Sequence, residues 1–111
     1  MKEIEVWKVV FRQANARYRS VASSAASIYY KQNEWAERPG GCGPLAAFAT
    51  KFDAYLFALY SCPAVRTAIF KATAVRSRAR SLWSKDGKKY QAHSDYLGTV
   101  YCDRIKLLER V

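Results

Sequence analysis

Apolar residues recur in short β-branched and aromatic runs along the first third of this 111-residue chain. Ile4 to Arg12 reads IEVWKVVFR, and the segments Arg17 to Ser23 and Ile28 to Trp35 have a similar character. Runs of this length and composition favour strands over helices. Because side chains alternate across a strand, Arg17 and Arg19 would share one face of the second run. The pattern therefore predicts three strands before residue 36.

One segment has the pattern of a helix. Thr50-x-x-Asp53 has the spacing of a capping box, and an acid in the first turn suits the helix dipole. Apolar side chains then follow at helical spacing, at Phe52, Tyr55, Leu56 and Leu59. We expect this stripe to cover the sheet as part of the core, with a partner-binding face as the alternative. Pro63 should end the helix.

The remaining segments again favour strands. A tight loop is expected at Pro39 to Pro44, followed by a short strand over Leu45 to Ala49. The β-branched segment from Ala64 to about Ser81 predicts one bent strand or two. Asp86-Gly87, within the basic sequence KDGKK, is a hairpin signal. Thr99 to Val111 predicts a last strand, whose final turn could equally be helical.

Together these elements predict a single α+β domain. We expect a twisted, mostly antiparallel sheet of about five strands, with the helix from Thr50 to Tyr60 packed on one face. A chain of 111 residues, half of them hydrophobic, can bury a core of its own.

The sequence gives no sign of a membrane span, a disulfide framework or a metal site. Its longest uncharged stretches, Pro39 to Thr50 and Ala54 to Val65, fall short of the roughly 20 residues that cross a bilayer. The three cysteines, at 42, 62 and 102, form no close pair, and with His93 they lack the spacing of ordinary zinc sites. We expect a cytoplasmic protein with free thiols and no cofactor.

Positive charge is concentrated in one part of the sequence. Residues 66 to 89 hold eight of the nineteen basic residues and only one acid, Asp86. If Arg76 to Arg80 is extended, alternate arginines project from one face over roughly 13 Å. Arginine binds phosphate in a bidentate manner, and aromatic rings stack on bases. The candidate ligand-binding residues are Arg76, Arg78, Arg80, Trp83, Lys88 and Lys89, with Arg17 and Arg19 as second candidates.

Catalysis has little support in the sequence. The single histidine, His93, is accompanied by no nucleophile elbow and no short-range Cys-His signature. A metal-free phosphodiesterase, with His93 beside Lys88 or Lys89 as acid and base, is an alternative that no spacing requires. We therefore expect a non-catalytic protein.

The order of several segments resembles small uncharacterised proteins of phages and mobile elements. These segments are Tyr18 to Val21, Gly40 to Pro44, Leu45 to Phe57 and Val100 to Val111. The resemblance implies an accessory protein of the anti-defence type, a class that includes inhibitors of CRISPR complexes and sponges for nucleotide immune signals. The strand-then-helix unit also resembles part of the ADP-ribosyltransferase fold, but the late acids do not follow that family's pattern.

These observations predict non-catalytic binding of an anionic, phosphate-containing ligand, either a nucleotide signal or a short nucleic acid. Sequestration by a phage anti-defence protein would be the biological use. The alternative is an anti-CRISPR-like inhibitor that contacts a host defence protein in a nucleic-acid-binding complex. A homodimer formed through exposed edge strands is a further expectation.

Overall fold

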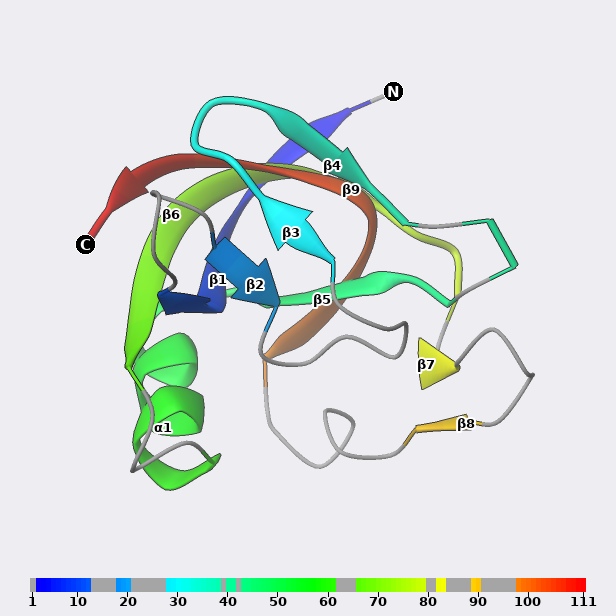
Figure 1. The fold of residues 1–111 in the computed structure, drawn as a ribbon. Coiled ribbons are helices and arrows are strands. Elements are labelled where there is room, and N and C mark those ends of the chain that lie inside the picture. The colour runs from blue at the N-terminus through cyan, green and yellow to red at the C-terminus, as the bar shows by residue number, and fades with distance from the viewer. Residues whose placement is uncertain are drawn as a thin grey trace.

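Three long strands form the frame of the molecule (Figure 1). The computed structural model describes residues 2–12, 18–20, 28–38, 40–41, 43–61, 66–79, 82–83, 89–90 and 98–111. Strand β6 (Thr67–Arg76) pairs antiparallel with β1 (Glu3–Arg12) on one edge and with β9 (Thr99–Arg110) on the other. Strand β5 (Leu45–Phe48) then pairs with both β1 and β9. The four strands therefore close into a ring.

Three short strands extend the sheet beyond this ring. Strands β2 (Tyr18–Ser20) and β3 (Tyr29–Tyr30) continue from β1, and β4 (Trp35–Glu37) pairs with β9. Among the described residues the antiparallel sheet thus has seven strands, so the prediction of about five was wrong. One reason is that the predicted strand Ile28 to Trp35 is interrupted by a turn at Asn33, whose φ is 66°. A separate ladder joins β7 (Leu82–Trp83) to β8 (Lys89–Tyr90), as the hairpin signal predicted.

Alternating side chains fill the interior of the ring. Val6 and Val10 of β1 point inward, while Val9 points to the opposite face. The strand β6 contributes small residues and one ring, Phe70, which meets Tyr18 edge to face with centroids 4.8 Å apart. Alanines on β6 leave room for larger side chains from the facing strands, namely Leu45, Val100, Ile105 and Leu107.

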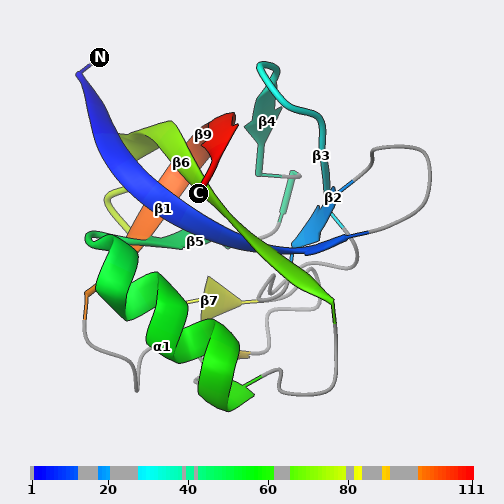
Figure 2. The same ribbon diagram turned by 90° about the vertical axis from the view of Figure 1, so that its left-hand side faces the viewer.

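The helix α1 (Lys51–Ser61) packs on the outside of the ring, against β1, β5 and β6 (Figure 2). Its cap forms as predicted: the Asp53 amide donates to Thr50 Oγ1 over 3.1 Å, and this hydroxyl donates to Asp53 Oδ2 over 2.8 Å. Gly98 lies so close to the Asp53 carboxylate that a Cβ there would collide with it.

The face of α1 that meets the sheet is not the predicted one. Ala54 and Phe57 are buried against Val9 and Phe48, whereas Phe52, Tyr55 and Leu59 are exposed. The physical reason is that apolar residues surround the helix, so helical spacing alone cannot choose a face. The side toward the sheet is the one with Ala54 and Ala58, whose small side chains allow close approach to the strands.

The last strand runs its full predicted length. β9 stays extended through Arg110, so the alternative of a final helical turn was wrong. Its C-terminal half is held between β6 and β4, which require extended backbone. Within the described ranges, no helix is long and apolar enough to cross a membrane.

Candidate anion-binding site

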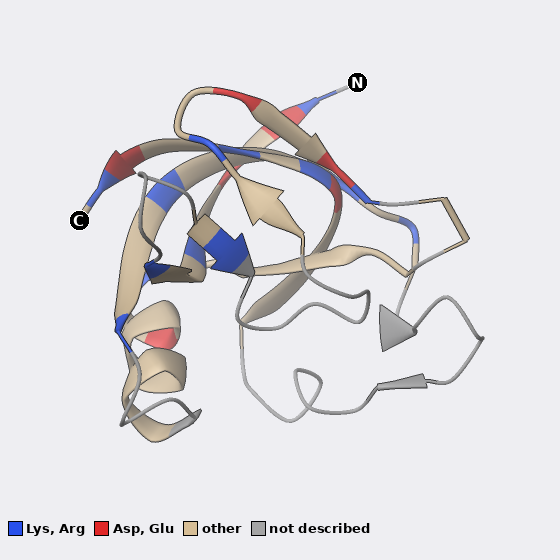
Figure 3. Cartoon of the chain, viewed as in Figure 1, with Lys and Arg blue, Asp and Glu red and all other residues tan. Residues whose placement is uncertain are grey.

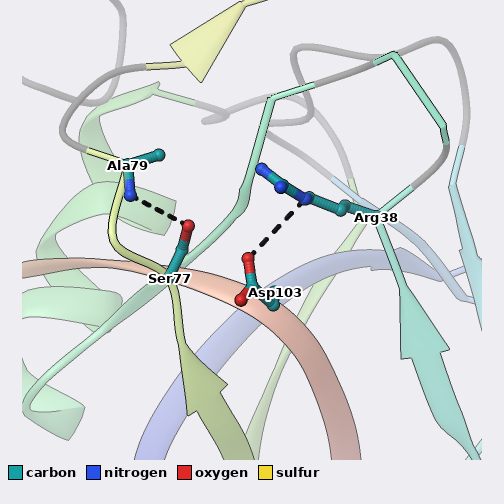
Figure 4. Close-up of polar contacts among 4 residues, drawn as sticks. All are labelled: Arg38, Ser77, Ala79 and Asp103. Carbon is teal, nitrogen blue, oxygen red and sulfur yellow. Dashed lines mark hydrogen bonds and ion pairs between the residues drawn. The ribbon is translucent and has the colours of Figure 1, made fainter.

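The chain turns sharply where β6 ends, and this turn carries two of the predicted arginines. The Ser77 amide still donates to the Tyr101 carbonyl of β9 over 2.8 Å. The Ala79 amide then donates to Ser77 Oγ over 3.0 Å (Figure 4). Such a side-chain contact replaces a strand hydrogen bond and bends the backbone. Arg76 is therefore the last residue of the strand, and Arg78 lies in the bend after it.

Both arginines line one hollow of about 510 Å³. The start of β9 also lines this hollow, and its residues Thr99 and Tyr101 carry hydroxyl groups. The remaining described lining residues are Ser77, Ala79 and Val100. Arg76 is brought to the start of β9 by the β6–β9 ladder, in which it pairs with Cys102.

The charge of this hollow is positive and uncompensated among the described residues. Its described lining contains two arginines and no acid, and neither Arg76 nor Arg78 forms a salt bridge within the described part of the chain. Both arginines are exposed, so their guanidinium groups are accessible from solvent. Burial raises the pKa of the Tyr101 phenol. A phenol is protonated at neutral pH with or without this rise, so Tyr101 can donate a hydrogen bond.

A neighbouring hollow of about 460 Å³ has balanced charge. It is lined by Glu37, Arg38, Val75, Asp103 and Arg104. Arg38 Nε lies 3.6 Å from Asp103 Oδ1 (Figure 4), and the Arg38 amide donates to the Asp103 carbonyl over 3.0 Å. Two acids and two bases thus line this second hollow, and an added anion would compete with the carboxylates already present.

The other predicted ligand-binding residues are only partly placed. Trp83 and Lys89 pair with each other in the β7–β8 ladder, and their side chains are not described. Arg17, Arg80 and Lys88 lie outside the described residues, and so do the alternative catalytic residue His93 and the hairpin turn itself.

Arg19 lies apart from the hollow at the end of β6. It pairs with Phe11, and its guanidinium carbon lies 5.3 Å from the centre of that ring. Phe11 in turn pairs with Thr67, at the opposite end of β6 from Arg76. The structure therefore does not bring the second candidate together with the first.

Inside the ring lies a cation that we did not single out from the sequence. Lys8 is 1% exposed, and its Nζ donates to the Ala46 carbonyl over 2.6 Å and lies 5.6 Å from the centre of the Tyr30 ring. Burial lowers the pKa of Lys8 from 10.5 to about 8, and the nearby Cys102 thiol acts in the opposite direction. The signal was present in the sequence, because Lys8 has the same strand parity as Val6 and Val10.

Cys102 offers no ready nucleophile. Burial raises the pKa of its thiol to about 12, although Lys8 and Arg76 partly oppose this. The Sγ–H donates to the Val100 carbonyl over 3.6 Å, so the thiol behaves as a buried core group. Among the described residues, no three His, Cys, Asp or Glu side chains are placed to hold a metal ion together.

Basic and aromatic side chains also meet on the outer face of β4 and β9. The charged groups of Arg104 and Lys106 lie 4.6 and 5.6 Å from the centre of the Trp35 ring. The β4–β9 register produces this arrangement, since Trp35 pairs with Lys106. Figure 3 shows basic residues on most of the described strands, so charge alone does not single out one surface. What distinguishes the end of β6 is a hollow with arginines and no acid among its described lining residues.

Comparisons with known proteins gave no match: no family model fits the chain, and no curated protein or solved structure is similar to it.

Proposed function

We propose that this protein binds a phosphate-containing ligand, without catalysis, in the hollow at the end of β6. One observation carries the proposal: Arg76 and Arg78 line a single hollow whose described lining contains no acid. Guanidinium groups donate paired, charge-assisted hydrogen bonds to phosphate oxygens. An anion entering this hollow would not have to displace a carboxylate of any described residue from either arginine.

The lining residues from β9 fit a ligand that carries a base or a sugar in addition to phosphate. Tyr101 presents both a ring and a protonated hydroxyl, and Thr99 adds a second hydroxyl. Bases and ribose groups are recognised by such combinations of stacking and hydrogen bonding. A nucleotide therefore matches the lining better than inorganic phosphate. Sequestration of a nucleotide signal, the use implied by the resemblance to phage proteins, would need only a site of this kind.

The test is a melting experiment with matched double variants. The purified protein is heated with pyrophosphate, mononucleotides, cyclic dinucleotides, ADP-ribose and short oligonucleotides. We expect one class to raise the melting temperature by mass action, and Arg76→Gln/Arg78→Gln to abolish that rise. The control is Arg66→Gln/Arg110→Gln, which removes the same charge from exposed positions at the other end of β6 and β9 and should keep the response.

Two results would count against the site. A panel without any response contradicts binding of these ligands. Equal losses in both double variants would show that net charge, and not this hollow, attracts the anion. For a responding oligonucleotide, affinity should fall steeply with salt concentration, because counterions are released when phosphates are neutralised.

A further inference from the structure

The outer face of α1 is apolar, and none of the described residues covers it. Four large side chains on it are exposed, to 66%, 54%, 48% and 72%, at Phe52, Tyr55, Leu59 and Tyr60. They recur at helical spacing on one side, while Ala54 and Phe57 face the sheet from the other. A helix that is apolar on all sides is normally buried on all sides. The sequence of α1 thus fits a helix with a packing partner on both faces, whereas the ring of strands contacts only one face.

The exposed area is sufficient for a modest interface. At roughly 200 Å² for a large side chain, the four exposed fractions leave about 500 Å² of these residues open to solvent. A two-fold contact would bury this patch in both copies, for a total of about 1,000 Å² before any neighbouring residue is counted. A biological interface should bury more than roughly 1,000 Å², so this patch together with its neighbouring residues reaches the lower limit.

The charge distribution makes the face of α1 the place where a second copy of this chain meets the least repulsion. The chain carries a formal net charge of +10, so two copies repel each other over most of their surface. α1 is an exception, because Lys51 and Asp53 are its only charged residues and balance each other. Figure 3 shows the helix almost free of the basic residues that mark the strands. This face therefore allows two copies to approach with little repulsion.

The strand edges are poorer candidates for self-association. The path of paired strands ends in β3 and β4, which are two and three residues long. Edges this short provide few free hydrogen-bonding groups. We propose that the protein forms a two-fold dimer through the exposed apolar face of α1, with Phe52, Tyr55, Leu59 and Tyr60 of each copy packed against the same residues of the other.

The test measures mass against concentration by sedimentation equilibrium. We expect the wild-type mass to double as concentration rises. Leu59→Arg should remain a monomer, because it places two equal charges inside the contact, which weakens association on the order of 100-fold. An arginine in the last turn suits the helix dipole, so the helix itself should tolerate the change. The matched control is Val111→Arg, which changes another exposed apolar residue to the same cation and should still dimerise.

A second variant avoids dependence on an introduced charge. Phe52→Ala/Tyr60→Ala removes the two most exposed rings and should raise the dimer dissociation constant by about tenfold or more. The proposal is overturned if the wild type is a monomer at all concentrations, or if Leu59→Arg dimerises as the wild type does. It is also overturned if a monomeric wild type instead sediments with anionic lipid vesicles through the same residues.

Discussion

Lys8 inside the ring of strands and Arg76 at the end of β6 lie in opposite surroundings. The Lys8 ammonium is removed from water, and burial lowers its pKa to about 8. The Arg76 guanidinium is exposed, and it lines a hollow together with a second arginine. The two residues are nevertheless near enough to Cys102 for both to lower the pKa of its thiol.

The difference teaches which of the two positive charges can be used for binding. A buried cation in a low-dielectric interior costs free energy in proportion to its desolvation and has little access to a ligand. An exposed arginine with no acid beside it keeps its charge at no such cost, and its donors are free to meet an incoming anion. Basic residues in this chain should therefore be divided by environment before any are assigned to a site.

The largest expected effect is at Lys8. The unfolded lysine keeps a pKa of 10.5, so between pH 8 and 10.5 the unfolded state holds more protons than the folded state. The free energy of unfolding should therefore rise with pH, in total on the order of 3 kcal/mol for this group. Between pH 7 and 9 we expect a rise of about 1 kcal/mol in urea titrations of the wild type, and none from this position in Lys8→Met.

The measurement is limited to pH 7 to 9 because, at higher pH, Cys102 changes the free energy of unfolding in the opposite direction. Its thiol has a pKa raised to about 12, so above pH 9 the folded state holds the extra proton and stability falls with pH. The raised pKa of Tyr101 acts in the same sense above pH 10. If the free energy of unfolding changes with pH equally in Lys8→Met and in the wild type between pH 7 and 9, then Lys8 is hydrated and its pKa is not lowered by burial.

A smaller effect, on ligand affinity, is expected from a substitution at Arg76 that keeps the charge of the side chain and changes its shape. Arg76→Lys preserves the positive charge at the hollow but removes the planar, forked set of donors. We expect the affinity for a ligand identified in the melting screen to fall about tenfold, near 1.4 kcal/mol, with stability nearly unchanged. Titration calorimetry of the wild type and of Arg76→Lys measures the two affinities. An unchanged affinity in Arg76→Lys would mean that the positive charge of the hollow attracts the anion and that the hydrogen-bond geometry of the guanidinium group is not needed.

The strand pattern could be predicted where one face of a strand is buried against the core. The segments Ile4 to Arg12 and Thr99 to Val111 alternate clearly, and both are long strands. Ring closure could not be predicted, because it depends on β5 pairing with two strands distant in sequence. The buried face of α1 was missed for a different reason, since a helix with apolar residues on every side carries no directional signal.

The candidate site was predictable in composition and not in geometry. The arginine cluster is visible in the sequence, and Arg76 and Arg78 do share a hollow. The proposed ladder of arginines assumed a strand that continues past residue 76, whereas Ser77 bends the chain there. Tyr101 and Thr99 could not be linked to these arginines from sequence, because the β6–β9 ladder joins residues more than twenty positions apart.

The smallest expected effect comes from making the second hollow resemble the first. Asp103→Asn removes the carboxylate beside Arg38, while the backbone hydrogen bond between the same residues remains. Because both side chains are more than a third exposed, the loss in stability should stay below about 1 kcal/mol. With one of its two acids removed, the described lining of this hollow carries a net positive charge, so the variant should gain a second, weak site for pyrophosphate, detected as added stoichiometry in calorimetry. An unchanged stoichiometry would indicate that removing one acid is insufficient, either because Glu37 remains in the lining or because hydroxyl groups such as those of Thr99 and Tyr101 are also required.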